Sequence, residues 1–381
     1  MTVRLSLVMP ADARPLAPIR SRPMDVNGRL IQGVQTVSTL AGVYGAWAKA
    51  HYTKGGRATG HGDQIAHAVN LLCAAGAGGV SLAHFGPRML LEFQRVLAED
   101  AEQRWGLKTI NLYVSHVVGM FAWGVSREIV PVETLTALKT VRPLRRGRAP
   151  APGVKPPRPP VKIKPVPASA LELTRRHVSA MIRDMIDIQV LTAMRPTELV
   201  SMRLSDLYET DDPDVVYYRV APDANKVEHH GLDRVVAIGP RTLKILAPYI
   251  ARARALDPDR AYLFRPCDAH AEWLREKHES RKTPLSCGNA PGTNRRGNPM
   301  WAPGEKYTPA SYRKAIARGC ERAGVPAWSP NRLRHNGATA IASRVAIEVA
   351  KEQLGHTSIA TTAGYVEPDR GRLTAWAREH A

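Results

Sequence analysis

Apolar side chains in the first part of the chain recur every three or four residues, which is the spacing of one face of a helix. These apolar faces lie within 40–47, 65–72, 90–97 and 110–121. The residues expected to begin the helices are Ser38 or Thr39, Asp63, Pro87 and Thr109. We therefore predict a bundle of four or five helices over 34–138.

The segment 139–166 interrupts this pattern. It contains nine basic residues and no acidic one between Lys139 and Lys164, and eight prolines between Pro143 and Pro165. Because proline lacks an amide proton and restricts its own φ, we expect an extended linker that forms neither a core nor a regular helix. The linker is either a solvated spacer or a stretch that lies along a phosphate backbone, and its charge favours the second interpretation.

A second domain, 167–381, begins with another helical pattern. Its apolar face runs from Val178 to Ile186 and stops near Arg195, after which Pro196 is suited to begin a short helix. After this short helix the apolar residues no longer repeat every three or four residues, but every second residue.

Two β-branched runs, 215–220 and 234–238, have a period of two and flank a polar segment. They predict a β-hairpin with Lys226 near its turn. A helix after Pro240 and a short strand over 262–264 are expected to follow.

The remaining segments differ in regularity. Residues 265–306 are rich in charge, glycine and proline, and we expect a long insertion loop with one short helix at 271–279. Helical periodicity returns at Ser311 and lasts to the C-terminus. At the other end, residues 1–33 mix proline, arginine and glycine without periodicity, which predicts a basic flexible arm.

Composition points to a polyanionic partner. The 381 residues include 54 lysines and arginines against 34 acidic residues, a net charge of +20. Such a chain attracts nucleic acid over long range. It has no apolar run of 18 residues to span a membrane, and Met1 to Met9 is too short for a signal sequence. Four cysteines in so long a chain form no disulfide framework, so a reducing cytoplasm is the expected location.

Three stretches of the second domain carry candidate chemistry. They read LTAMRPTELVSMRLSDL, NRLRHNGATAIA and LGHTSIATTAGY, and they contain Arg195, Arg334, His356 and Tyr365. In order and wording they resemble the two arginine boxes and the nucleophile segment of the tyrosine recombinases, also called the phage integrase family. Lys226 lies between the two boxes, as the hairpin lysine of that family does, and the resemblance covers about 178–365.

The resemblance implies a fold and a function. The fold would be mainly α with a small antiparallel sheet: a helical-bundle (SAM-like) core-binding domain followed by a tyrosine-recombinase catalytic domain. The function would be site-specific DNA recombination or integration, as in mobile elements, through a 3′-phosphotyrosyl intermediate. Double-stranded DNA would be the substrate, four copies would assemble on two sites, and neither ATP, a metal nor a cofactor would be needed.

Elementary chemistry explains these residue types. A phenol with a pKa of ~10 is a poor nucleophile unless the phosphate that it attacks is made electrophilic. Arg195 and Arg334 suit that task, because guanidinium groups bind phosphate oxygens bidentately and stabilise the charge of the transition state. The resemblance assigns Tyr365 as the nucleophile, Lys226 as the general acid and His356 as a phosphate-oxygen donor.

One position departs from the family pattern. Asn331 stands three residues before Arg334, where the family usually has a histidine. An asparagine donates a hydrogen bond but does not exchange a proton near neutral pH, so we expect an active but slowed enzyme. His335 is in register with a second family histidine that is more often structural.

Each of these residues, taken alone, also has a purely structural explanation. An R-x-x-E pattern such as Arg195 to Glu198 is usually a surface salt bridge, His356 suits a helix cap, and Tyr365 suits a core. Cys267, His270, His278 and Cys287 have a spacing that fits no common closed zinc site, so no metal is expected.

Two other functions compete with recombination. A type IB topoisomerase would use the same chemistry to relax DNA, and a non-catalytic DNA-binding relative would explain Asn331. The arm, the separate bundle and the integrase-like boxes favour recombination. After Tyr365, residues 366–381 with Leu373, Ala375 and Trp376 are suited to a helix that docks either into a neighbouring copy or on its own domain.

Overall fold

The computed structural model describes residues 33–54, 56–100, 105–222, 224, 233–257, 259, 261–282, 302–368 and 370–380. The chain forms two compact units, 1–161 and 162–381. The predicted arm, apart from Gly33, and the predicted hairpin lysine, Lys226, lie outside the described residues.

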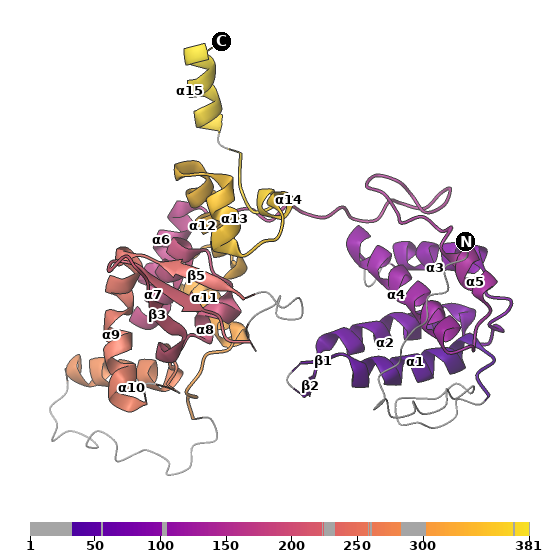
Figure 1. The fold of residues 1–381 in the computed structure, drawn as a ribbon, viewed down its shortest axis with the longest axis horizontal. Helices are drawn as coiled ribbons and strands as arrows, with labels where there is room; N and C mark the ends of the chain where they lie inside the picture. Colours follow the sequence, from indigo (N-terminus) through magenta and orange to yellow (C-terminus); the bar gives the residue numbers. More distant parts are fainter. Residues whose placement is uncertain are drawn as a thin grey trace, which may run out of the picture. The chain divides into compact units, whose positions relative to one another are not determined.

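Unit 1 is a helical bundle. Its elements are α1 (Val37–His51), β1 (Thr53–Lys54), β2 (Arg57–Ala58), α2 (Gly60–Leu72), the π-helical turn η1 (Cys73–Ala77), α3 (Pro87–Glu99), α4 (Leu107–Ser126) and α5 (Val132–Leu138). Helices α1, α2 and α4 pack side by side (Figure 1). The predicted helical periodicity is thus confirmed, and the two-residue strands β1 and β2 form a small hairpin that was not predicted.

The predicted start of α1 was wrong by two or three residues. Thr36, and not Ser38 or Thr39, is the N-cap, since its hydroxyl accepts a hydrogen bond from Thr39 N. The Thr39 hydroxyl in turn accepts one from Thr36 N at 3.0 Å. This reciprocal capping box satisfies two amide protons that have no partner within the helix.

Unit 2 is mainly helical around one small sheet. Its helices are α6 (Ala168–Arg176), α7 (Ala180–Thr192), α8 (Pro196–Val200), the 3-10 turn η2 (Leu204–Asp206), α9 (Pro240–Leu256), α10 (Pro266–Glu279), α11 (Pro309–Arg322), α12 (Asn331–Arg344), α13 (Ile347–Leu354), α14 (Ile359–Ala363) and α15 (Arg370–His380). The antiparallel sheet has the order β3 (Leu207–Glu209), β4 (Val216–Arg219), β5 (Val235–Ile238).

The predicted hairpin is confirmed by β4 and β5, whose register pairs Tyr218 with Val236. Strand β3 and helix α6 were not predicted. The strand expected over 262–264 was wrong, because Tyr262 forms only an isolated bridge to Arg203.

The short helix predicted over 271–279 is confirmed, but it begins five residues earlier than expected and fills the first part of the predicted loop. Helix α10 occupies Pro266–Glu279, with Pro266 in its first turn. Asp268 near its N-terminus accepts from Arg252 of α9 at 3.1 Å. Charged residues therefore form a surface helix here, held by a partner that is distant in the sequence.

The two ends of the basic segment, residues 139–166, attach to different units. In unit 1, the Asn111 side chain donates to Leu144 O at 3.0 Å and accepts from Leu144 N at 2.9 Å. In unit 2, the Asn336 carboxamide bonds both backbone groups of Val166 at 2.8 Å. Val166 is 2% exposed, and Val141 and Leu144 pack against the core of unit 1, so the expectation that this segment contributes to no core was wrong at both ends.

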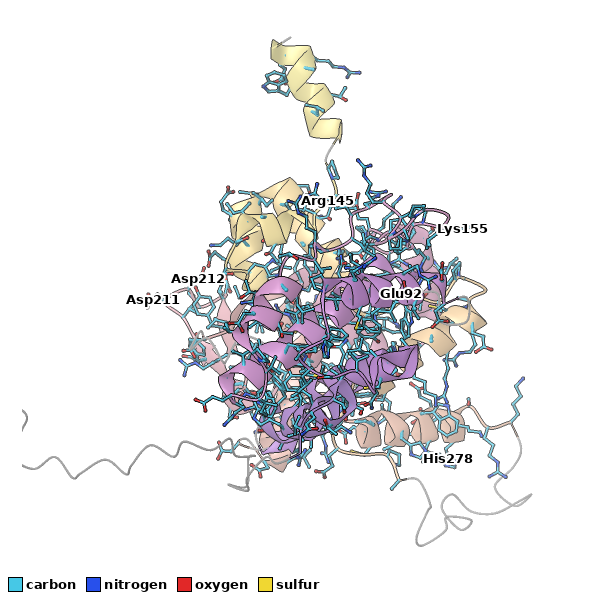
Figure 2. The ribbon with its side chains drawn as sticks, turned by 90° about the vertical axis from the view of Figure 1, so that its right-hand side faces the viewer. Glu92, Arg145, Lys155, Asp211, Asp212 and His278 are labelled. Atoms are coloured by element: carbon cyan, nitrogen blue, oxygen red, sulfur yellow. The ribbon has the colours of Figure 1, made fainter. Side chains whose placement is uncertain are left out.

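Between these attachments the segment contains no helix. Its cations Arg145 and Lys155 are exposed (Figure 2). Within the described part of the chain, no helix is both long and apolar enough to cross a membrane.

Candidate active site

Arg195 is placed by the tight connection between α7 and α8. Helix α7 ends at Thr192, and its C-cap residue Ala193 has a left-handed backbone with a φ of 55°. Arg195 is then the N-cap of α8, and its backbone N and its Nη1 donate to the two Glu198 oxygens, both at 2.7 Å. Glu198 has no exposed side-chain surface, so the surface salt bridge that this spacing usually indicates is here a buried one.

Arg334 lies inside the unit, with an exposed fraction of 2%. It donates from Nη1 to Ala193 O at 2.8 Å and from Nη2 to Leu354 O at 2.6 Å. Helix α12 comes this close to α7 because residue 337 is glycine: a Cβ there would lie 2.7 Å from the Ala193 Cβ. Burial, followed by the nearby Arg195 charge, lowers the pKa of Arg334.

His356 follows Gly355, which ends α13 in the left-handed conformation. Its Nε2 lies 3.0 Å from Arg334 Nη2 and its Nδ1 lies 3.0 Å from Thr362 Oγ1. Because arginine only donates, Nε2 must accept and Nδ1 must carry the proton. Burial and the Arg334 charge lower the pKa of His356 to about 4, so the imidazole is neutral at pH 7.

Tyr365 lies just after α14, at the edge of a small apolar cluster that includes Ala193 and Leu354. Its ring stacks on His335, with ring centres 4.4 Å apart, and lies 5.1 Å from the His356 ring. The Arg334 guanidinium lies 5.5 Å from the Tyr365 ring centre. The structure therefore brings Arg195, Arg334, His356 and Tyr365 into one region.

Two predicted residues are not placed in this cluster. Asn331 is the exposed first residue of α12, and within the described part of the chain its side chain makes no hydrogen bond. Lys226 lies outside the described residues. Arg334, three residues after Asn331, is the first side chain of α12 that enters the site.

Sequence reasoning missed Arg234. It is the residue before β5 and is 2% exposed. Its Nε donates to Glu198 Oε1 at 3.2 Å, and its Nη2 donates to Gln353 O at 2.8 Å. The sequence did carry one signal for Arg234, which is a charged residue on the inward side of an apolar strand. Its partners could not be identified because they lie far away in the sequence.

Glu198 is thus shared by two arginines. Burial alone raises the pKa of its carboxyl, yet the charges of Arg234 and Arg195 hold that pKa below the ordinary value. Three guanidinium groups (Arg195, Arg234 and Arg334) against one carboxylate leave a net charge of +2. A phenol and a neutral imidazole complete a site suited to an anion such as a phosphodiester.

The zinc candidates lie elsewhere in unit 2. Cys267, His270 and His278 are on α10, with His278 on its exposed side (Figure 2), and Cys287 is outside the described residues. Among the residues that the structure describes, no three His, Cys, Asp or Glu side chains form a group able to hold a metal ion.

Unit 2 resembles a known protein family. Residues 169–372 match the model of the phage integrase family. The comparison with curated protein sequences gives no match.

Several solved structures share the fold. The XerH site-specific recombinase bound to difH substrate is 18% identical, with a TM-score of 0.51 over 88% of this chain and 84% of that one. A lambda integrase(75-356) dimer bound to a COC' core site is 12% identical, with a TM-score of 0.58 over 88% and 97%. The Tn1549 transposon integrase in complex with transposon right end DNA is 14% identical, with a TM-score of 0.55 over 91% and 100%.

Proposed function

This chain belongs to the phage integrase family, and on that premise we propose that it cuts and rejoins DNA as a site-specific tyrosine recombinase with Tyr365 as its nucleophile. One observation carries the assignment. The Tyr365 ring lies against His335, His356 and the Arg334 guanidinium, although these groups come from α12 and two later segments. A phenol beside a buried guanidinium is suited to attack a phosphate that the guanidinium binds.

Each group has a role in the proposed reaction. Arg195 and Arg334 bind the non-bridging oxygens and stabilise the charge of the pentacoordinate transition state. The Tyr365 hydroxyl loses its proton to solvent, and its oxygen bonds to phosphorus while the bond to the 5′ oxygen breaks, which leaves a 3′-phosphotyrosyl link and a free 5′ hydroxyl. Lys226 is proposed to donate the proton to that leaving oxygen. A 5′ hydroxyl from a second strand reverses the step, so no energy source is required.

His356 needs a change before it acts as a donor. Its Nε2 accepts from Arg334, so a phosphate oxygen has no proton to receive from that nitrogen. A bound phosphate would draw Arg334 to itself and favour the charged imidazole, because a nearby anion raises the pKa of a base. We propose that substrate binding turns Nε2 of His356 into a donor.

Asn331 is proposed to supply at most a hydrogen bond. Replacing it by histidine restores a group that exchanges protons near neutral pH. We expect Asn331→His to cleave DNA faster than the parent protein, and rates no higher than the parent's would show that the asparagine is harmless.

The proposed partners are double-stranded DNA and further copies of the chain. A lambda integrase tetramer bound to a Holliday junction shares this fold, with a TM-score of 0.57 and 11% identity. We propose four copies on two paired sites, acting on cytoplasmic DNA. Helix α15, with Leu373 and Trp376 exposed, is a candidate contact between copies.

Covalent capture tests the proposal. The full chain is incubated with fragmented DNA that includes the sequence flanking its gene, denatured with detergent, and the protein-linked DNA is sequenced. The captured sequence is then rebuilt as a nicked duplex, from which the cleaved strand loses a short fragment and cannot religate. We expect an adduct with the parent and with Tyr217→Phe, which removes an exposed tyrosine hydroxyl of the same unit, and none with Tyr365→Phe.

Other outcomes would contradict the proposal. No adduct from the parent on any captured duplex would favour a non-catalytic DNA-binding protein. An adduct that survives Tyr365→Phe would exclude this nucleophile. Rapid relaxation of supercoiled plasmid without a specific site would favour topoisomerase activity.

A further inference from the structure

Arg234 and Arg334 are the two largest fully buried side chains of the described residues, and the proposed reaction does not use Arg234. Its side chain is 1% exposed, whereas that of Arg195 is 18% exposed. Arg234 therefore lies behind Arg195, and the Glu198 carboxylate separates the two guanidinium groups.

The hydrogen bonds define this arrangement closely. Glu198 Oε1 accepts from Arg195 Nη1 at 2.7 Å and from Arg234 Nε at 3.2 Å. Glu198 Oε2 accepts from Arg195 N at 2.7 Å and faces Arg234 Nη2 at 3.5 Å. Each carboxylate oxygen is thus shared between the two arginines.

The remaining donors of Arg234 anchor it to the strand and to the helix before His356. Nη1 donates to Val235 O at 2.6 Å, and Nη2 donates to Gln353 O at 2.8 Å. Gln353 in turn donates from Nε2 to Thr192 O and to Ala237 O, both at 3.0 Å. Arg234 is therefore held on three sides by backbone groups or by Glu198.

The charges give this arrangement a consequence. A buried carboxylate that paired with Arg195 alone would cancel its charge, because the two groups are shielded from water. Arg234 supplies the second positive charge, so the buried group of three keeps a net charge of +1 that faces the site through Arg195. A fixed charge of this kind stabilises a developing negative charge without reorganisation.

We infer that Arg234 is a positioning residue that holds Glu198 and offsets its charge. Arg195 then faces the scissile phosphate in a fixed orientation and with a positive charge that Glu198 does not cancel. This inference rests on the proposed function. It concerns the strength of transition-state stabilisation, and not the supply of the proton by Lys226.

Single-turnover cleavage of the captured nicked duplex tests the role. Arg234→Met removes the charge but retains an unbranched side chain, and we expect the rate at saturating DNA to fall about 100-fold. The DNA concentration for half saturation should change less than about threefold, because DNA affinity comes from many phosphate contacts. Arg234→Lys keeps the charge but not the planar guanidinium group, and its cleavage rate should lie between those of the parent and Arg234→Met.

A compensating variant separates charge from packing. Adding Glu198→Gln to Arg234→Met removes the carboxylate that would otherwise cancel Arg195, so at least about tenfold of the lost rate should return. Arg252→Met is the matched control. Arg252 forms a partly exposed ion pair with Asp268 in the same unit, and its loss should leave cleavage unchanged.

A modified leaving group separates Arg234 from the general acid. In a duplex with sulfur in place of the 5′ bridging oxygen, the leaving thiolate needs no proton. The defect of Arg234→Met should persist on this duplex. Its disappearance would show that Arg234 acts through the hairpin and would overturn the inference.

The remaining outcomes are equally decisive. A folded Arg234→Met that cleaves within threefold of the parent overturns the inference, as does a double variant no faster than Arg234→Met. Thermal unfolding of each full chain identifies variants that fail to fold. If Arg234→Met fails to fold, Arg234→Lys is the deciding variant. A cleavage rate of Arg234→Lys equal to that of the parent would then contradict the positioning role. No adduct from the parent itself contradicts the proposed function, and this inference with it.

Discussion

The cores of the two units differ in what they bury. The buried polar side chains described in unit 1 are Gln94, His116 and Thr134, among a large set of aliphatic and aromatic residues. Unit 2 buries Glu198, Arg234 and Arg334 beside an apolar core of similar size. Burying charges is costly unless each has a partner, so unit 2 keeps them where they support the proposed chemistry.

The difference shows two ways of holding a core together. In unit 1, apolar side chains pack against one another without charged partners, as in the stacked pair Phe85, just before α3, and Phe121 of α4, with ring centres 4.8 Å apart. In unit 2, each buried charge depends on a few specific partners, at least one of which comes from a distant segment. Substitutions should therefore have specific, large effects in unit 2.

The largest effect is expected from Glu198→Ala. It leaves the buried Arg234 without its carboxylate, and we expect unit 2 to lose about 3–5 kcal/mol of unfolding free energy. Denaturant unfolding of the full chain measures this. Glu172→Ala is the matched control, because Glu172 also pairs with two arginines but is half exposed, and it should cost less than about 1 kcal/mol. Equal costs for the two would show that burial of the carboxylate does not set the cost of its loss.

Gly355→Ala should have the next largest effect. The φ of Gly355 is +63°, and an added Cβ would lie 2.7 Å from the Arg234 Cδ. Backbone strain and the clash together should cost about 2–4 kcal/mol. Gly324 has a φ of +65° with open space around it, so Gly324→Ala should cost only about 1 kcal/mol. Thermal unfolding compares the two, and similar costs would mean that Arg234 moves away easily.

Removing Asn111 or Asn336, which bond the two ends of segment 139–166, should lower the unfolding free energy by a smaller amount that is similar in both units. Asn111→Ala removes two hydrogen bonds to Leu144, and Asn336→Ala removes two to Val166. Each should cost about 1–2 kcal/mol in the unfolding of its own unit. A loss in both units from either substitution would show that the basic segment couples their stabilities.

The smallest effect is expected from pH. The pKa of His356 is lowered to about 4 in the folded chain, against an ordinary value of 6.5, so the unfolded chain binds more protons between these values. Stability of unit 2 should therefore fall as the pH falls from 6.5 to 4, and should not depend on this group above 6.5. The effect is modest because His356 is only half buried.

Two histidine variants check which unit responds. His356→Gln should reduce the pH dependence of unit 2 alone. The pKa of His116 is also lowered, by burial and by His61, so His116→Gln should reduce the pH dependence of unit 1 alone. An unchanged slope in the corresponding unit would contradict the assignment.

Much of the fold followed from local patterns. Helical spacing in unit 1 and the change of period before β4 predicted the main elements, because an amphipathic helix or strand repeats its own environment along the chain. Helix α6 and the first five residues of α10 escaped prediction, because few of their residues are large and apolar. Their positions depend on partners such as Thr174 with Trp328, which donates to it at 3.1 Å from 154 residues away.

The sequence by itself determined which chemical groups are present, and in what order. Arg195, Arg334, His356 and Tyr365 were recognisable from short stretches, as was the departure at Asn331. Tertiary structure alone decided the protonation of His356, the burial of Glu198 and the involvement of Arg234. Those properties depend on pairs 20 to 120 residues apart, such as Arg234 with Gln353. Burial and charge pairing set them, and neither is encoded in local spacing.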